Sequence, residues 1–206
     1  MKLVVADTET GGLDSKVHSL LSVGMWTLDT VERTLTDPLY FLVKEPHIVT
    51  TPYAMAINGL DLVDIERDGL TPHEALCAIN EYCSRVCRQP IPVGHNVGFD
   101  IGFLERLLDL IPGTSLPFHY RTIDVPSLLT TMYLAGVLPK DISSSKKALE
   151  YFGMHRGSVH NALDDAECTG KVYLGLLGML SDAGTVLEGV LGPLSPFSTS
   201  NQRTLS

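Results

Sequence analysis

The sequence predicts an α/β domain built on a mixed five-stranded sheet that is flanked by helices. Three strand-like segments come first, and from residue 71 onward helical patterns alternate with short apolar strands. The chain has 206 residues, of which 44% are hydrophobic and 19% are charged, and these values are typical of a globular domain with a full core. We therefore expect one folded domain over residues 1–180 and a flexible tail over residues 181–206.

Three strands are expected near the N-terminus. An apolar run over residues 2–7 predicts the first, and Thr10-Gly11-Gly12 is a turn signal after it. Residues 20–28 and 34–43 predict two more strands, and the short polar link between them indicates an antiparallel hairpin. Proline has no N–H to donate to a sheet, so Pro38 places the third strand at an edge or at a bulge.

Helices dominate the rest of the chain. Thr71-Pro72-His73-Glu74 is a capping box with proline at the first helical position, and apolar residues then recur with a period of 3.6. The further expected elements are a strand at 90–93, a helix at 98–110, a strand at 121–124, a helix ending near 134, a short helix ending at 153 and a last helix at 161–180.

Two acidic side chains end the first strand. A strand alternates its side chains with period two, so Asp7 and Glu9 project from the same face. Two like charges at the end of a buried strand repel each other and resist ionisation. A divalent cation such as Mg²⁺ between them would remove this conflict, whereas two solvated acids would also explain an isolated pair.

Two further acids are expected in the first turns of helices. Asp100 follows a short apolar strand and opens one helix, and Asp165 opens the last helix with His160 on the loop before it. Acids in a first turn also favour the helix dipole, so each of them alone has a structural explanation. Asp164 is expected to be an acid of that kind.

Three motifs occur in a fixed order along the chain: D-x-E at Asp7, N-x-x-F-D at Asn96 and H-x-x-x-x-D at His160. With these motifs the sequence resembles the DEDDh family of 3'-to-5' exonucleases. The first motif resembles the proofreading epsilon subunit of bacterial DNA polymerase III. The resemblance covers about residues 1–180, which are expected to be the exonuclease domain, and it implies a ribonuclease H-like fold.

The resemblance also implies a site for two ions of Mg²⁺ or Mn²⁺. Asp7 would bridge both ions, Glu9 and Asp165 would complete one site, and Asp100 would support the other through water. His160 would be the general base for the nucleophilic water, since a histidine is mostly neutral at pH 7. The chemistry independently favours these residue types, because two ions roughly 3.5–4 Å apart clamp the attacking and leaving oxygens while four carboxylates balance their charge.

Substrate contacts are expected around the first motif. The expected binding residues are Thr8, Thr10, Gly11, Leu13, Asn58, Asn96 and Phe99. By resemblance, Leu13 packs on a base as the wedge residue of the family does, and Asn58 stands where the family frequently has a histidine. Tyr53 and Phe103 are further stacking candidates, although Phe103 is expected in the core.

The net charge of −9 argues against tight, non-specific binding of long duplexes. The resemblance implies release of nucleoside monophosphates from the 3' end of single-stranded or frayed DNA, and the preference for DNA rests on the resemblance alone. One alternative changes the substrate to RNA ends or short oligoribonucleotides, and another is an inactive nucleic-acid-binding or polymerase-tethering module. Such a relic would be expected to have lost at least one of the five acidic and histidine residues.

The proofreading resemblance makes a DNA polymerase the candidate protein partner. No apolar stretch approaches the roughly 18 residues of a membrane span, and the N-terminus lacks the pattern of a signal peptide. We therefore expect a cytoplasmic protein without a membrane partner.

Overall fold

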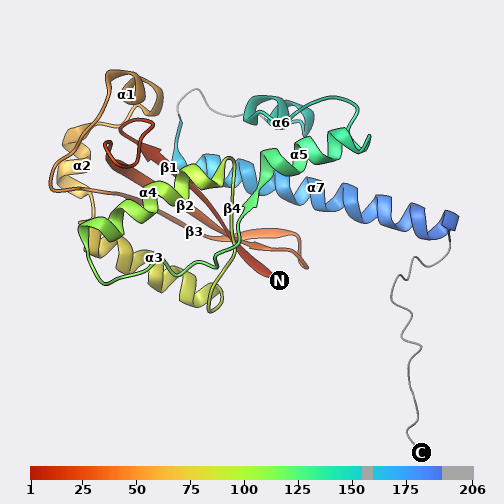
Figure 1. The fold of residues 1–206 in the computed structure, drawn as a ribbon, viewed down its shortest axis with the longest axis horizontal. Coiled ribbons are helices and arrows are strands. Elements are labelled where there is room, and N and C mark those ends of the chain that lie inside the picture. Colours follow the sequence, from red (N-terminus) through yellow and green to blue (C-terminus); the bar gives the residue numbers. More distant parts are fainter. Residues whose placement is uncertain (155–159, 192–206) are drawn as a thin grey trace, which may run out of the picture.

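The computed structural model describes residues 1–154 and 160–191, which form a mixed five-stranded sheet in the order β3-β2-β1-β4-β5 (Figure 1). The strands are β1 (Lys2–Thr10), β2 (Leu20–Asp29), β3 (Thr34–Leu42), β4 (Pro92–Gly94) and β5 (Ile123–Asp124). The first three pair in antiparallel fashion, and β4 and β5 run parallel to β1. The expected strand set and mixed sheet are confirmed, with β3 at an edge as Pro38 requires.

Seven helices lie in the described part of the chain. They are α1 (Pro52–Asn58), α2 (Leu62–Asp68), α3 (Pro72–Val86), α4 (Val97–Leu110), α5 (Val125–Leu134), α6 (Ser145–Tyr151) and α7 (Ala162–Leu191). The sequence analysis did not predict α1 and α2. Each is only two turns long and owes its start to a local cap, because the side chain of Thr51 accepts the N–H of Ala54 and that of Asp61 accepts the N–H of Val63.

Helix α7 is longer than predicted, and the expected end of the last helix at residue 180 is wrong. It continues to Leu191, and Figure 1 shows its C-terminal part reaching past the sheet. The expected end rested on the content of Gly, Pro, Ser and Thr beyond Ser181, but a glycine inside a helix costs only about 1 kcal/mol and does not by itself stop one. The rest of the expected tail, residues 192–206, lies outside the described residues.

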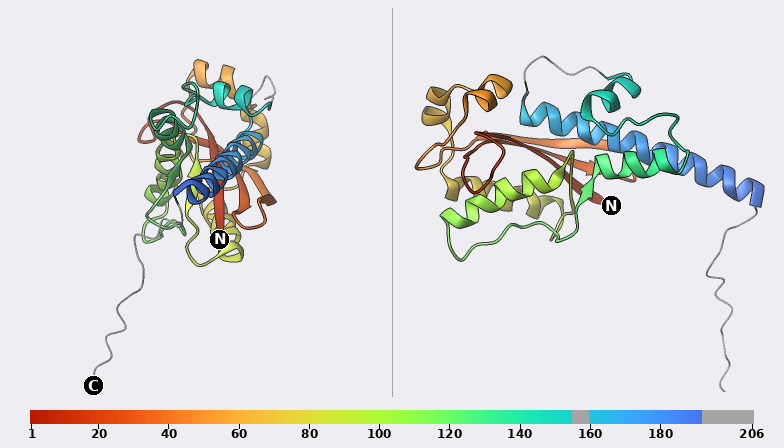
Figure 2. Two further views of the ribbon diagram at one scale, coloured as in Figure 1. Left: turned by 90° about the vertical axis from the view of Figure 1, so that its right-hand side faces the viewer. Right: turned by 45° about the horizontal axis from the view of Figure 1, so that its top comes forward.

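The sheet is covered on both faces, and β1 shows how the sequence divides between them. Leu3 and Val5 pack in a core beneath α5, α6 and α7, whereas Val4 and Ala6 pack in a second core beneath α3 and α4. The right-hand view of Figure 2 shows α7 running alongside the strands and continuing beyond them. No helix in the two described ranges is both long enough and apolar enough to cross a bilayer.

Candidate active site

The acids of the first motif lie where β1 extends beyond its parallel neighbour, β4. Asp7 and Glu9 follow Leu3 and Val5 on the face covered by α7, because side chains alternate along the strand. The pairing of β4 with β1 ends at Val5, so the last residues of β1 extend past β4. Both α4 and α7 begin near this end of the sheet, which brings their first turns toward the two acids.

Asp100 reaches the site from the first turn of α4. The chain turns into α4 at Asn96, whose left-handed backbone (φ 67°) is held by the carboxylate of Asp124, which accepts its N–H at 2.8 Å. Asp100 is only 3% exposed, and the Thr8 hydroxyl donates to its Oδ1 at 2.7 Å. Burial raises the pKa of Asp100 to about 7, because the carboxylate loses its hydration, while the hydrogen bond from Thr8 lowers it.

The sheet itself fixes the first turn of α7, which carries Asp165. Gly24 of β2 has no side chain, and the α7 backbone lies so close that a Cβ there would be 2.3 Å from the nitrogen of Leu163. Two residues along the same face, the Trp26 indole N–H donates to the carbonyl of Leu163 at 3.0 Å. The side chain of Asn161 caps the helix by accepting the N–H of Leu163 at 2.9 Å.

These elements bring the predicted acids and His160 to one cavity of about 240 Å³. It is lined by Asp7, Thr8, Glu9, His95, Phe99, Asp100, Ser145, His160, Asp165 and Thr169. His160 Nδ1 lies 3.5 Å from Asp165 Oδ2, and one potential ligand atom each from Glu9, His160 and Asp165 lie within 4.8 Å of one another.

The donor set of this cavity suits a hard divalent cation. Four of its ten described lining residues are acids, and none of the ten is a lysine or arginine that would balance them. Carboxylate oxygens are the ligands that Mg²⁺ and Mn²⁺ prefer. A bound cation would also favour the charged form of Asp100, whose burial otherwise opposes ionisation.

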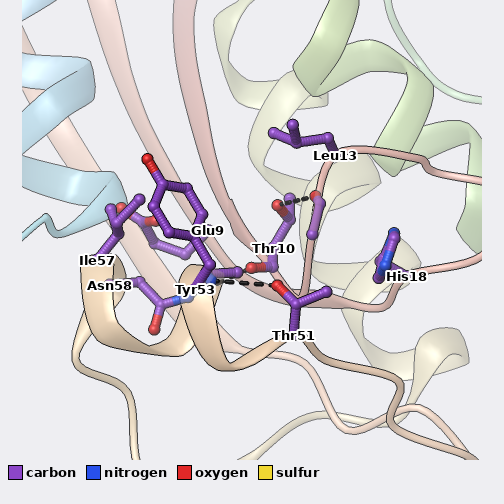
Figure 3. Close-up of a pocket in the computed structure, with 10 residues that line it drawn as sticks. Glu9, Thr10, Leu13, His18, Thr51, Tyr53, Ile57 and Asn58 are labelled. Atoms are coloured by element: carbon purple, nitrogen blue, oxygen red, sulfur yellow. Dashed lines mark hydrogen bonds between the residues drawn. The ribbon is translucent and has the colours of Figure 1, made fainter.

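A second, larger cavity of about 410 Å³ adjoins the first and shares Glu9 with it. It is lined by Glu9, Thr10, Gly12, Leu13, His18, Thr51, Tyr53, Ala54, Ile57 and Asn58. Figure 3 shows Leu13 on the loop after β1 and, across from it, Tyr53 and Ile57 on α1. Leu13 and Tyr53 are 81% and 73% exposed, so two large apolar residues are accessible to a ligand.

Five of the seven residues expected to bind substrate line one of the two cavities. Thr10, Leu13 and Asn58 line the larger cavity, where Asn58 is buried and donates to the carbonyl of Thr10 at 3.3 Å. Thr8 and Phe99 line the carboxylate cavity instead.

Gly11 and Asn96 line neither of these two cavities, although the sequence predicted substrate contacts for both. Gly11 brings two chain segments together, because a Cβ there would lie 2.2 Å from the carbonyl oxygen of Val49. Asn96 is exposed and supplies the left-handed turn before α4. Phe103 is buried, as expected for a core residue.

Several lining residues carried no signal in the sequence analysis. Ser145 and Thr169 line the carboxylate cavity from α6 and α7, and each is an ordinary polar residue of a helix. His18 and Thr51 line the larger cavity, and Thr51 is the N-cap of the unpredicted α1. The Thr51-Pro52 start signal would have located that helix.

The exonuclease family model named RNase_T matches residues 4–173. The chain belongs to this family. It is a 3'-to-5' exonuclease, so the expected enzyme class is confirmed and the alternative of an inactive module is not supported.

Among its relatives, ribonuclease T of Escherichia coli strain K12 is 33% identical over 184 residues, which span 82% of this chain and 81% of that protein. Ribonuclease T of Blochmanniella pennsylvanica is 29% identical over 185 residues, which span 84% and 83% of the two chains.

Solved structures confirm the ribonuclease H-like fold of the DEDDh exonucleases. The nuclease domain of 3'hExo, a DEDDh family member bound to rAMP, superposes with a TM-score of 0.71 at 18% identity, over 88% of this chain and 92% of that one. Exonuclease I of E. coli in complex with a dT13 oligonucleotide gives a TM-score of 0.72 at 15% identity, over 90% of this chain and 43% of that one.

Proposed function

We propose that this enzyme hydrolyses phosphodiesters from the 3' end of a single-stranded or frayed nucleic acid, with divalent metal ions, and releases nucleoside 5'-monophosphates. The observation that carries the proposal is the convergence of four acids and His160 on one cavity that shares Glu9 with an open apolar pocket. One cavity can hold the scissile phosphate while the other holds the terminal nucleotide.

In this proposal Asp7, Glu9, Asp100 and Asp165 hold two ions of Mg²⁺ or Mn²⁺. When bound, such ions stabilise the charge of the phosphoryl transition state and lower the pKa of a coordinated water. His160 accepts the proton of the attacking water. Asp165, 3.5 Å from Nδ1 of His160, keeps the imidazole ring turned toward the site and stabilises its protonated form.

The apolar pocket selects an unpaired end. Leu13 projects from one wall and Tyr53 and Ile57 from the other, so a base can lie between apolar surfaces instead of stacking in a duplex. The volume of about 410 Å³ falls within the range of small-ligand pockets. A paired terminal nucleotide would first have to leave its partner base, which favours single-stranded and frayed ends.

The sugar of the substrate is a separate question. The resemblance of the first motif to proofreading exonucleases favours DNA, and in that case a DNA polymerase is the protein partner we propose. RNA ends are the second candidate, because the relatives that cover four fifths of the chain are named ribonuclease T. Digestion of DNA and RNA strands of the same sequence, each labelled at the 5' end, compares the two directly by their kcat/KM.

The proposed activity is tested by adding the purified chain to a 5'-labelled single strand while Mg²⁺ or Mn²⁺ is titrated. We expect a ladder that shortens from the 3' end only when the metal is present, and monophosphates as products. The Asp7→Ala variant should be folded and inactive. Products shortened from the 5' end, or equal turnover in the presence of EDTA, would contradict the proposal.

A further inference from the structure

A buried ion pair lies behind the apolar pocket, outside the carboxylate cavity. Glu45 is 3% exposed, and Arg106 of α4 binds its carboxylate through two nitrogens, with Nε donating to Oε1 at 2.7 Å and Nη2 to Oε2 at 2.8 Å. The same carboxylate accepts the Ser19 hydroxyl at 2.8 Å and the N–H of Leu20 at 3.0 Å. Four donors therefore compensate the buried charge.

These contacts connect α4 to one wall of the apolar pocket, the loop over residues 11–19. Nη1 of Arg106 donates to the carbonyl of Ser15 at 3.1 Å, in the middle of the loop. Ser19, which is bound to Glu45, accepts the N–H of Gly11 at 2.8 Å through its carbonyl and so closes the loop. The segment that carries Leu13 is thus tied at both ends and in its middle.

The same contacts reach the opposite wall. The Ser19 hydroxyl accepts the N–H of Val49 at 2.9 Å, and the carbonyl of Val49 accepts the N–H of Ser19 at 3.0 Å. The carbonyl of Gly11 accepts the N–H of Thr51 at 2.7 Å, and Thr51 is the N-cap of α1. The helix that presents Tyr53 therefore starts from a residue bonded to the opposite wall.

We propose that the Glu45–Arg106 ion pair positions the two walls of the pocket that receives the 3'-terminal nucleotide, an inference that rests on the function proposed for that pocket. Neither residue lines the pocket. They act through Leu13 and Tyr53, whose separation they set before the strand arrives, and a preformed pocket avoids the ordering cost of binding. The planar guanidinium fixes both carboxylate oxygens at once, which a lysine cannot do.

The ion pair should affect binding more than chemistry. Asp100 is also on α4, but it is held at the other end of that helix by Thr8 and by the bonds of Asp124 to the turn before the helix. Loss of the ion pair therefore loosens the pocket while the carboxylate cavity keeps its own contacts. KM should rise and kcat should stay close to the wild-type value.

Three variants of the full chain test the inference. Glu45→Gln keeps the size of the side chain and removes its charge. Arg106→Lys keeps the charge and removes the planar guanidinium that binds both carboxylate oxygens. The double variant Glu45→Gln, Arg106→Gln leaves no unpaired charge. Ile79→Val in the core under α3 is the control for general destabilisation, because it shortens a buried side chain that lines neither cavity. Each protein is assayed for melting temperature, for steady-state kinetics on a labelled single strand, and for amide hydrogen exchange over residues 11–19.

We expect each single variant to raise KM about tenfold, with kcat changed less than about twofold, and to speed exchange in the loop. The double variant should have a higher melting temperature than Glu45→Gln, since it no longer buries an unpaired charge. It should keep the raised KM, because the contacts that set the distance between the two walls are still missing. A wild-type KM in the folded single variants, or the same KM rise in Ile79→Val, would overturn the inference.

Failure of the underlying function would look different. In that case the wild-type chain would not shorten the strand, or Leu13→Ala would leave KM unchanged. Hydrogen exchange would still report whether the ion pair holds the loop, because that measurement does not depend on activity. Unchanged exchange in Arg106→Lys would overturn the positioning role by itself.

Discussion

Replacement of Gly24 by alanine should reduce catalysis far more than the same substitution elsewhere at the interface between α7 and the sheet. A Cβ at this position would lie 2.3 Å from the nitrogen of Leu163, whereas ordinary contacts begin at 3.4 Å. The first turn of α7 would therefore have to move by about 1 Å. Because that turn carries Asp165, a shift of this size is expected to lower kcat by about 10²-fold.

Gly170→Ala is the matched control, because it is the same substitution at the same interface, on α7 itself and facing the sheet. Its Cβ would meet the ends of the Leu35 and Val5 side chains at 2.8 to 3.2 Å, and side chains can adjust more easily than backbone. We expect this variant to lose some stability and to keep kcat within about threefold of the wild type. Single-turnover kinetics on a labelled strand, with melting temperatures for both variants, make the comparison.

Two results would refute this reasoning. Wild-type kcat in a folded Gly24→Ala variant would show that α7 can move without disturbing Asp165. Equal losses in Gly24→Ala and Gly170→Ala would show that the effect reports general destabilisation and not the placement of one helix turn.

Three further predictions concern the cavities. His160→Ala should lower kcat by roughly 10²–10⁴ at saturating metal, the range for loss of a positioned proton acceptor, and stopped assays across pH 6–9 measure it. Leu13→Ala should raise KM for a single strand with little change in kcat, and a wild-type KM would contradict the wedge role. Asp100→Asn should abolish hydrolysis yet stabilise the metal-free fold at pH 8, because burial opposes ionisation of the carboxyl that the amide replaces. The buried carboxyl makes the wild-type fold less stable as the pH rises from 3.8 to about 7, whereas the amide does not titrate. The stability that the variant gains over the wild type, measured by urea unfolding in EDTA, should therefore shrink toward pH 4.

The carboxylate cavity was predictable from the sequence because each of its acids sits at a local landmark. Alternation along β1 places Asp7 and Glu9 on one face, and first turns after a strand or a loop place Asp100 and Asp165. These signals need only a few neighbouring residues. They therefore predict which side chains meet at the end of the sheet, although not the distances between them.

The walls of the apolar pocket were harder to predict, because long-range contacts hold them. Glu45 and Arg106 are 61 positions apart, and no pattern near either residue in the sequence indicates a buried ion pair. The prediction of where α7 ends was wrong for a related reason. Composition after Ser181 favoured a loop, whereas a helix already anchored on the sheet tolerates two glycines.

Glu9 lines both cavities, so the two sites share one negative charge. A bound strand that changes the electrostatic field at that carboxylate, or its orientation, also changes the affinity of the neighbouring site for a cation. Thermodynamic linkage makes the effect reciprocal, so a strand that tightens cation binding by some factor must itself be bound more tightly by the same factor once the cation is present. If a strand tightens cation binding in this way, the enzyme would be fully loaded only after it has captured an end, and an idle molecule would hold its metal less tightly.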